Sequence, residues 1–178
     1  MIAALFLAIQ LFGQSQSEVC EGDFPNATEV MTLLKRTYML RSLEDSPNVQ
    51  CAYQIFYNYR EHGKYDKVVL PRGAKTHPQQ SPLYVKRVVN STIYLDTKAD
   101  FDMQPTFLDI LYSNLTSCMV TKGPYKENFP QGCRLWLTNS SFANPEPRCI
   151  EGFKRHCNLT PFSSYNITGC VDLNAPLK

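Results

Sequence analysis

Hydrophobic and polar residues alternate along much of this chain with the period of two that half-buried β-strands require. The clearest case is residues 51–60 (CAYQIFYNYR), where the odd positions are cysteine, isoleucine or tyrosine and the even ones include Gln54, Asn58 and Arg60. This pattern predicts a strand with one largely aromatic face. That face consists of Tyr53, Ile55, Tyr57 and Tyr59.

Other extended stretches are separated by turns rich in proline, glycine and asparagine. Seven to nine short strands, without helices alternating between them, predict an all-β antiparallel meander that closes as either a sandwich or a barrel. We expect these further strands within residues 30–40, 68–70, 83–95, 106–121 and 132–138.

One amphipathic helix is expected near the C-terminus. Asn144 can cap it, and Pro145 and Pro147 suit its first turn. One face of this helix then carries Cys149, Phe153 and Cys157, spaced at i, i+4 and i+8. A barrel of about eight strands followed by one packed helix is the lipocalin architecture, and such a barrel can hold one small ligand.

The N-terminal residues 1–12 form a compact apolar run, and the small and polar residues 13–17 follow it. This order is typical of a secretory signal peptide, because the run is too short to span a bilayer. We therefore expect a signal peptide over 1–17, a single mature domain over 18–178, and a secreted protein that contacts no membrane.

Composition and motifs exclude several functional classes. The net charge of +2 in 178 residues does not indicate nucleic acid as a partner. The chain has no GxSxG, HExxH or glycine-rich nucleotide motif, and its three histidines stand without metal-ligand spacing. We expect neither an enzyme nor a bound metal or cofactor.

Cysteines and glycosylation sequons also indicate export. Seven cysteines without a CxxC pair favour a disulfide framework over a zinc or redox site. Chance would give only about one or two Asn-x-Ser/Thr sequons in this composition. Six are present, so we expect glycosylation at Asn26, Asn90, Asn114, Asn139, Asn158 and Asn166.

Three spaced motifs resemble the signature of the tick histamine-binding lipocalin family, which runs Cys-Asp-aliphatic, Glu-Leu-Trp or Glu-Leu-Tyr, and then Cys. The corresponding segments are 118–120 (CMV), 134–136 (RLW) and Cys149, separated by thirteen and twelve residues. Residues 33–38 (LLKRTY) also resemble the first strand of that family. The resemblance implies a salivary protein with an eight-stranded antiparallel barrel and a C-terminal α-helix packed on the outside.

The resemblance further implies disulfides between Cys51 and Cys170 and between Cys118 and Cys149. Because Cys157 lies about 12 Å further along the helix than Cys149, we expect it beside Cys133 on the neighbouring strand. This third pairing leaves Cys20 over. The alternative joins Cys20 to Cys133 and leaves Cys157 over.

In the family that this chain resembles, the acidic residues of the signature help to bind cationic amines such as histamine and serotonin. Here Met119 and Arg134 replace them, so one anion is lost and one charge is reversed. We therefore expect a small hydrophobic ligand (a sterol, fatty acid or eicosanoid), with Arg134 available to anchor a carboxylate. The expected ligand-binding residues are Tyr53, Ile55, Tyr57, Met119, Arg134 and Trp136.

Alternative interpretations remain open from the sequence. Arg134 can point outward while aromatic side chains simply fill the barrel, which suits a protein that acts by binding a host immune-cell protein. The altered signature and the sequons resemble the Japanin branch of the family, which implies a sterol ligand and action on dendritic cells. An amine scavenger needs other carboxylates, and the candidates are Glu29, Glu44, Asp45, Asp96, Asp100, Asp102 and Asp109.

Overall fold

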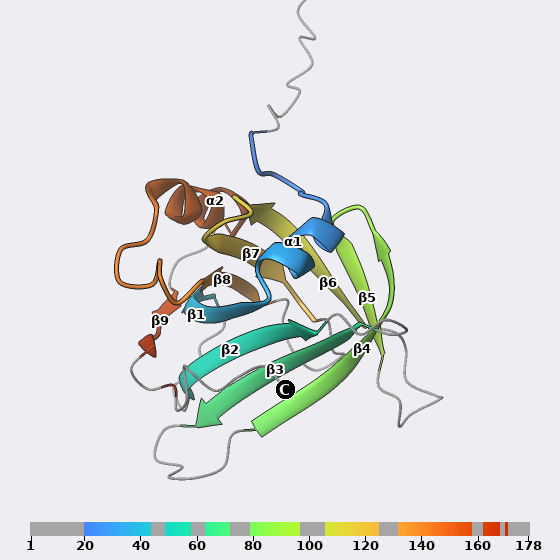
Figure 1. Ribbon diagram of the computed structural model, residues 1–178. Coiled ribbons are helices and arrows are strands. Elements are labelled where there is room, and N and C mark those ends of the chain that lie inside the picture. The colour runs from blue at the N-terminus through green and yellow to red at the C-terminus, as the bar shows by residue number, and fades with distance from the viewer. Residues whose placement is uncertain are drawn as a thin grey trace, which may run out of the picture.

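The computed structural model describes residues 20–43, 49–57, 63–71, 79–96, 106–124, 132–157, 162–167 and 170. Within these residues the chain forms a closed antiparallel barrel, because β1 pairs with β8 on one side and with β2 on the other (Figure 1). The eight barrel strands are β1 (Arg36–Ser42), β2 (Val49–Tyr57), β3 (Lys64–Pro71), β4 (Gln79–Val89), β5 (Thr92–Asp96), β6 (Thr106–Ser113), β7 (Cys118–Lys122) and β8 (Cys133–Leu137). A short strand, β9 (Ser163–Ser164), adds to β1. The predicted barrel is confirmed.

Two hydrophobic clusters lie on opposite faces of this closed sheet. The inner cluster fills the barrel and includes Phe56, Tyr65, Ile110, Met119 and Trp136. The outer cluster lies between the strands and the C-terminal helix. It includes Tyr38, Tyr112, Val120, Leu135, Phe153 and the six cysteines of the disulfides. Because side chains alternate along a strand, β7 and β8 each contribute residues to both clusters.

The C-terminal helix α2 (Pro147–Cys157) packs on the outside of the barrel against β6, β7 and β8 (Figure 1). Its buried face includes Cys149, Phe153 and Cys157, as the spacing predicted. The helix begins at Pro147, whose ring suits the first helical position, so Asn144 lies outside it.

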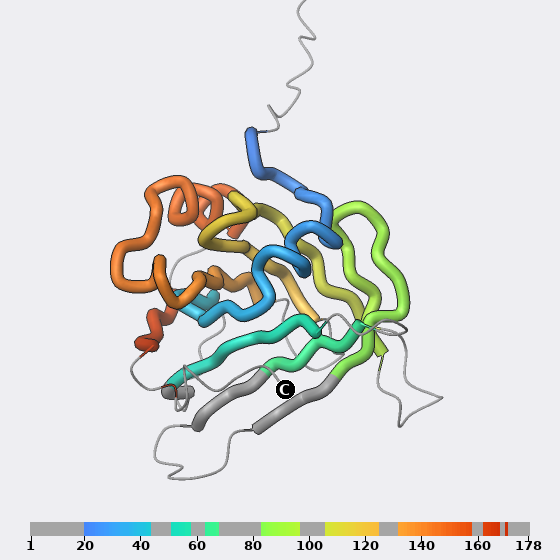
Figure 2. The backbone as a smooth tube through the Cα atoms, in the orientation of Figure 1, coloured from blue at the N-terminus to red at the C-terminus, as the bar shows by residue number. Residues whose placement is uncertain are grey.

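The strand expected over residues 30–40 is partly wrong, because its first half is the helix α1 (Ala27–Leu33). The Asn26 side chain caps this helix by accepting a hydrogen bond from the amide of Thr28 at 2.9 Å. Ala27 and Val30 are buried in the inner cluster, and the Ala27 amide donates to the Asn90 carbonyl in the β4–β5 turn at 2.9 Å. Figure 2 shows α1 lying between the β4–β5 side of the barrel and the β1 side.

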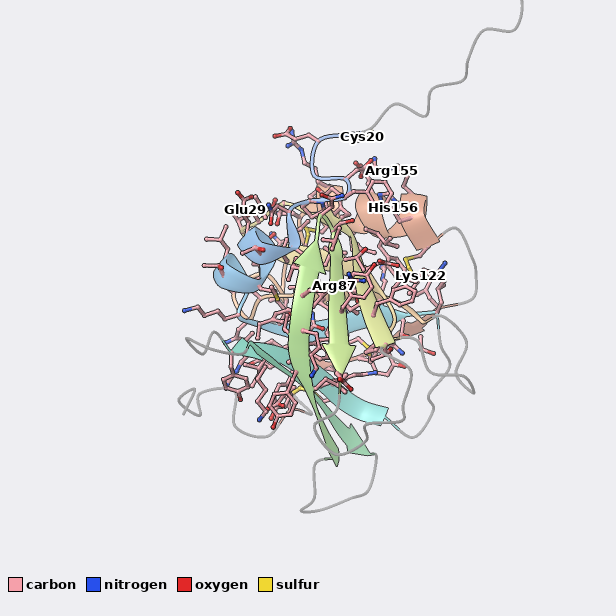
Figure 3. The ribbon with its side chains drawn as sticks, turned by 90° about the vertical axis from the view of Figure 1, so that its right-hand side faces the viewer. Cys20, Glu29, Arg87, Lys122, Arg155 and His156 are labelled. Atoms are coloured by element: carbon pink, nitrogen blue, oxygen red, sulfur yellow. A yellow bond between two sulfur atoms is a disulfide. The ribbon has the colours of Figure 1, made fainter. Side chains whose placement is uncertain are left out.

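The N-terminal segment is held against α2 by one carboxylate. Asp23 accepts from Arg155 at 2.7 Å and from His156 at 2.8 Å, and Figure 3 shows the side chains of Arg155 and His156 close to this segment. Burial alone would raise the pKa of Asp23, but the hydrogen bonds from His156, the Cys20 amide and Arg155 outweigh it and lower that pKa. The ion pair therefore stabilises the fold at neutral pH and weakens as acid protonates Asp23.

The structure contains all three expected disulfides: Cys51–Cys170, Cys118–Cys149 and Cys133–Cys157. The alternative Cys20–Cys133 pairing is excluded, and Cys20 is an exposed residue that belongs to none of the three. The expected signal peptide over 1–17 lies outside the described residues. Among the described helices, neither has the length and apolarity needed to cross a membrane.

The predicted sequons differ in how the fold uses their asparagine side chains. Asn114 is half-buried in the β6–β7 turn, where its Nδ2 donates to Ser117 Oγ at 2.6 Å and to Glu146 Oε2 at 3.1 Å. Its Oδ1 accepts from the backbone amides of residues 116, 117 and 118. Four other sequon asparagines, at positions 26, 90, 139 and 166, are exposed, and Asn158 lies outside the described residues.

We expect Asn114 to carry much less glycan than Asn139 when the protein is produced in a eukaryotic secretory pathway. A glycan replaces one of the two Nδ2 hydrogens, so one of the bonds to Ser117 or Glu146 would be lost. Enzymatic deglycosylation in heavy-oxygen water followed by peptide mapping measures the occupancy of each site. Equal labelling at Asn114 and Asn139 would contradict the expectation.

Candidate functional site

The interior of the barrel contains a polar centre around Gln54 of β2. Its Nε2 donates to Thr37 Oγ1 and to Met119 Sδ, each at 3.1 Å, and its Oε1 accepts from the Tyr65 hydroxyl at 3.2 Å. A thioether is a weak acceptor. Met119 therefore gives the Gln54 amide group a neutral partner at the position where the family signature has aspartate.

The same level of the barrel is filled by side chains. Gln54, Met119 and Tyr65 are 0% exposed and Trp136 is 1% exposed. A side chain with no exposed surface borders no cavity large enough for a water molecule. Burial at this level leaves no room for a ligand beside Met119, and the Trp136 indole instead donates to Thr121 Oγ1 at 2.8 Å.

Arg134 lies on the inner face of β8, two residues before Trp136. In the strand register it is opposite Thr121 of β7 and Ser42 of β1, which fixes its side chain on the inner face because directly paired residues share a face. One guanidinium nitrogen donates to the carbonyls of Gly123 at 2.7 Å and Gly132 at 3.3 Å. The alternative in which Arg134 points outward is therefore excluded.

The charge of Arg134 extends into the barrel interior, where it acts on Tyr65 of β3. Burial raises the pKa of the Tyr65 phenol strongly, the Arg134 charge opposes that increase, and Asp66 adds to it. Tyr65 is therefore neutral at physiological pH and donates its proton to Gln54.

The structure places the six expected ligand-binding residues in two groups. Met119, Arg134 and Trp136 are on the inner face. Tyr53, Ile55 and Tyr57 alternate with the inner residues of β2 and therefore lie on its outer face. Tyr53 packs against the outer cluster, where its ring is 5.9 Å from that of Tyr38, and the Tyr57 ring is 5.3 Å from the Lys64 ammonium. The inner face of β2 instead presents Ala52, Gln54 and Phe56. A ligand contact by Tyr53, Ile55 or Tyr57 stays a prediction from sequence, and the proposed function below uses only the inner group.

Sequence reasoning missed Gln54 and Lys67 as inner residues. Both lie on polar positions of amphipathic strands, which normally indicates a solvated face. Lys67 of β3 is directly opposite Gln54 of β2, so it shares the inner face of Gln54, and it is half-buried. One sequence signal could have indicated this. The opposite face of β2 is itself apolar and therefore also covered, so the polar positions of this strand need not face solvent.

The described carboxylates of the barrel strands all lie on the outer face. Asp66 is paired with Lys64 at 2.9 Å, Asp96 with Lys86 at 3.3 Å, and Asp109 accepts from Thr92 Oγ1 at 2.6 Å. Glu29 lies in the first turn of α1. The candidates at positions 44, 45, 100 and 102 are outside the described residues.

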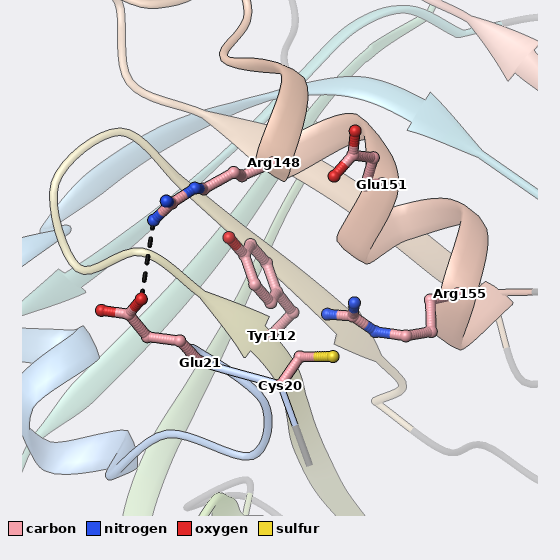
Figure 4. A pocket seen from close by; sticks show the side chains of 6 residues that line it. All are labelled: Cys20, Glu21, Tyr112, Arg148, Glu151 and Arg155. Carbon is pink, nitrogen blue, oxygen red and sulfur yellow. Dashed lines mark ion pairs between the residues drawn. The ribbon is translucent and has the colours of Figure 1, made fainter. Parts of the chain in front are cut away.

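A cleft of about 250 Å³ opens on the outside of the barrel, between the N-terminal segment and α2 (Figure 4). Tyr112 lies beside it, and Glu21 faces Arg148 across it at 3.6 Å. Its remaining lining residues are Cys20, Glu151 and Arg155. Because Arg148 already faces Glu21 and Arg155 also lines the cleft, this cleft is a poor site for a cationic amine. Within the described residues, no cluster of three or more His, Cys, Asp or Glu side chains is placed to hold a metal ion.

Comparison with known proteins identifies both a family and a fold. The family described as tick histamine binding protein matches residues 24–171. Insecticyanin from the tobacco hornworm Manduca sexta superposes with a TM-score of 0.62 at 7% identity, covering 83% of this chain and 85% of that one. AM182, solved as a serotonin complex, gives a TM-score of 0.59 at 17% identity, covering 85% and 98%.

Japanin from Rhipicephalus appendiculatus, solved with cholesterol, gives a TM-score of 0.48 at 14% identity over 67% of this chain and 84% of that one. That score is too low to assign this chain to the Japanin branch. A comparison with curated proteins found no match. At these identities the structural similarity establishes the lipocalin fold alone.

Proposed function

Because this chain belongs to the tick histamine-binding protein family and has the lipocalin fold, we propose that it is a secreted binding protein for one small hydrophobic ligand. The ligand classes proposed are sterols, fatty acids and eicosanoids. The proposal includes no catalytic role, since the family consists of binding proteins.

One observation carries the choice of a hydrophobic ligand over an amine. At the two positions where the family's acids would hold an ammonium, this barrel has a buried thioether and an arginine fixed on the inner face. A cationic amine would meet no counter-charge at Met119 and repulsion at Arg134. Most of the other described interior side chains are aliphatic or aromatic, and such side chains suit an apolar ligand.

A second candidate function is supported by the filled interior around Trp136. A barrel packed with its own side chains needs no cargo, and the protein would then act by binding a host immune-cell protein. This candidate differs from the first in predicting that no small molecule accompanies the folded protein.

The two functions are separated by purifying the secreted protein under mild native conditions and identifying what it carries. Denaturing mass spectrometry of an organic extract is expected to find one lipid in about one-to-one ratio with protein. An empty extract, together with no saturable binding of cholesterol or a fatty acid, would favour the protein-binding function. Calorimetric titration with histamine and serotonin is expected to show no saturable heat, and binding at micromolar concentration would contradict the proposal.

A further inference from the structure

The Phe24 ring lies in solvent beside a glycosylation sequon. It is 54% exposed, and it is one of four large hydrophobic side chains that are exposed among the described residues. Asn26 begins the sequon, which Ala27 and Thr28 complete, and Asn26 is also exposed. A single exposed apolar side chain needs no explanation by itself. The conformation that holds this ring in place is more informative.

The backbone fixes Phe24 in its exposed position. Its φ of 48° lies in the left-handed region, which is strained for a bulky side chain. The Ser113 amide donates to the Gly22 carbonyl at 2.9 Å, and the Phe24 amide donates to the Leu111 carbonyl at 3.0 Å. The ring meets that of His156 edge to face, with 5.2 Å between the ring centroids. Because one imidazole covers at most one face of the phenyl ring, the fold holds this ring without enclosing it.

The Asn26 side chain is oriented in a way that is compatible with a glycan. Its Oδ1 accepts a hydrogen bond from the Thr28 amide at 2.9 Å. Its Nδ2, the atom to which an N-linked sugar is attached, makes no hydrogen bond to another described residue. A glycan replaces one of the two Nδ2 hydrogens and leaves Oδ1 unchanged. Modification of Asn26 therefore costs no hydrogen bond within the described structure.

The same spacing of aromatic ring and sequon occurs a second time, and there the fold prevents the contact. Tyr112 precedes Asn114 by two residues, as Phe24 precedes Asn26. The Tyr112 ring is only 3% exposed, and α2 lies so close to it that a Cβ on Gly152 would come within 2.6 Å. The Nδ2 of Asn114 already donates hydrogen bonds to two side chains. Of these two sites, the one at Asn26 combines an exposed ring with an available amide nitrogen.

We propose that Asn26 carries an N-linked glycan whose first sugar, N-acetylglucosamine, packs on the exposed face of the Phe24 ring. In the attachment, a bond forms between Nδ2 and C1 of the sugar, the bond from C1 to the pyrophosphate of a lipid-linked donor breaks, and Nδ2 loses one proton. The C–H groups on one face of the sugar are attracted to the negative face of an aromatic ring. The contact covers apolar surface of the ring and stabilises the N-terminal segment in its position beside α2.

The test is a double-mutant cycle on protein secreted from a eukaryotic host. Phe24→Ala removes the ring. Thr28→Ala removes the sequon but keeps the helix cap, because the hydrogen bond to Asn26 comes from the backbone amide of Thr28. Calorimetry gives the Tm of the four proteins. Phe24→Ala is expected to lower the Tm by about 2–4 °C more in the glycosylated protein than in the Thr28→Ala protein, as the loss of one aromatic contact would do.

The matched control is Leu33→Ala. Leu33 is 59% exposed and lies at the opposite end of α1 from Asn26. Removing this side chain is expected to change the Tm equally with and without the sequon.

A second measurement observes the contact without a variant. Protein produced with labelled N-acetylglucosamine and blocked glycan processing is trimmed by an endoglycosidase to one sugar at each occupied site. The sugar at Asn26 is identified by the loss of its NMR signals in Thr28→Ala. Its carbon-bound protons are expected to resonate at higher field than those of the free sugar, because they lie over the face of the Phe24 ring.

Each failure has its own meaning. An unmodified Asn26 in peptide mapping would overturn the whole proposal. Sugar signals without a ring shift, or an equal effect of Phe24→Ala in both backgrounds, would overturn the contact and leave Asn26 as a plain glycosylation site. If Phe24→Ala itself prevents modification of Asn26, the sugar signals of the unaltered protein decide. None of these results bears on the proposed ligand, because Phe24 and Asn26 are exposed on the outside of the molecule.

Discussion

Replacing Met119 with aspartate, the residue that the family signature has there, is expected to lower the free energy of unfolding by about 3–5 kcal/mol at pH 7. Met119 is fully buried, and its sulfur accepts a hydrogen bond from the Gln54 amide. Arg134 is paired with Thr121 rather than with Met119 in the strand register, and its guanidinium is held by two backbone carbonyls, so neutralising the new charge would require this side chain to rearrange. Chemical denaturation followed by Trp136 fluorescence measures the loss.

The size of this loss is expected to depend on pH. Burial raises the pKa of a carboxylic acid in the folded protein above its unfolded value of about 3.9. Below that value the group is protonated in both states, and its ionisation costs no stability. Between the two pKa values the unfolded state is ionised and the folded state is not, so the free energy of unfolding falls as the pH rises. The loss is complete above the folded pKa. The Met119→Asp protein should therefore lose stability between pH 4 and 7 relative to Met119→Asn.

Two controls isolate the charge at Met119. Met119→Leu conserves volume and should cost less than about 1.5 kcal/mol. Met119→Asn has the shape of the aspartate without its charge. If Met119→Asp and Met119→Asn were equally stable at pH 7, the interior at this level would be hydrated or Arg134 would rearrange to pair with the acid, and the argument against amine binding would lose its physical basis.

The architecture follows from the sequence because it depends on patterns that span many residues. Alternation marked the strands, and the i, i+4, i+8 spacing of Cys149, Phe153 and Cys157 correctly predicted the face of α2. The 12 Å separation of Cys149 and Cys157 along the helix also identified Cys133 as the third cysteine partner. These inferences use periodicity, which the backbone geometry imposes directly.

The assignment of faces is harder to predict, as β2 shows. Its inner face is buried in the barrel interior, and its outer face is also largely covered, because Cys51 is buried in the disulfide to Cys170 and Tyr53 is half-buried against Tyr38. Polarity alone therefore misidentifies the inner face, since the more polar face with Gln54 points inward and finds partners there. The sequence analysis also did not predict α1. The Asn26 side chain caps this helix, and the cap favours a helix more strongly than the residues after Val30 favour a strand.

Removing the Cys118–Cys149 disulfide by changing both residues to alanine is expected to cost about 2–5 kcal/mol, or roughly 5–15 °C in Tm for a domain of this size. Both cysteines are fully buried, and the bond closes a loop with a sequence separation of 31 residues. It also anchors the first turn of α2 beside the turn that Asn114 holds together. Differential scanning calorimetry of the secreted proteins measures the change.

The matched control for this experiment is Cys20→Ser, because Cys20 is exposed and belongs to none of the three disulfides. A surface substitution of this kind should change stability by less than about 0.5 kcal/mol. The Cys133–Cys157 bond still attaches the last turn of α2 to β8 in the double variant, so the barrel should remain folded with the first turn of the helix loosened. Hydrogen exchange should then rise at the amides of Cys149 and Ile150, which donate to the Glu146 carbonyl, and stay low in β8. An unchanged Tm would instead show that packing of Phe153 against the barrel is sufficient to hold the helix in place.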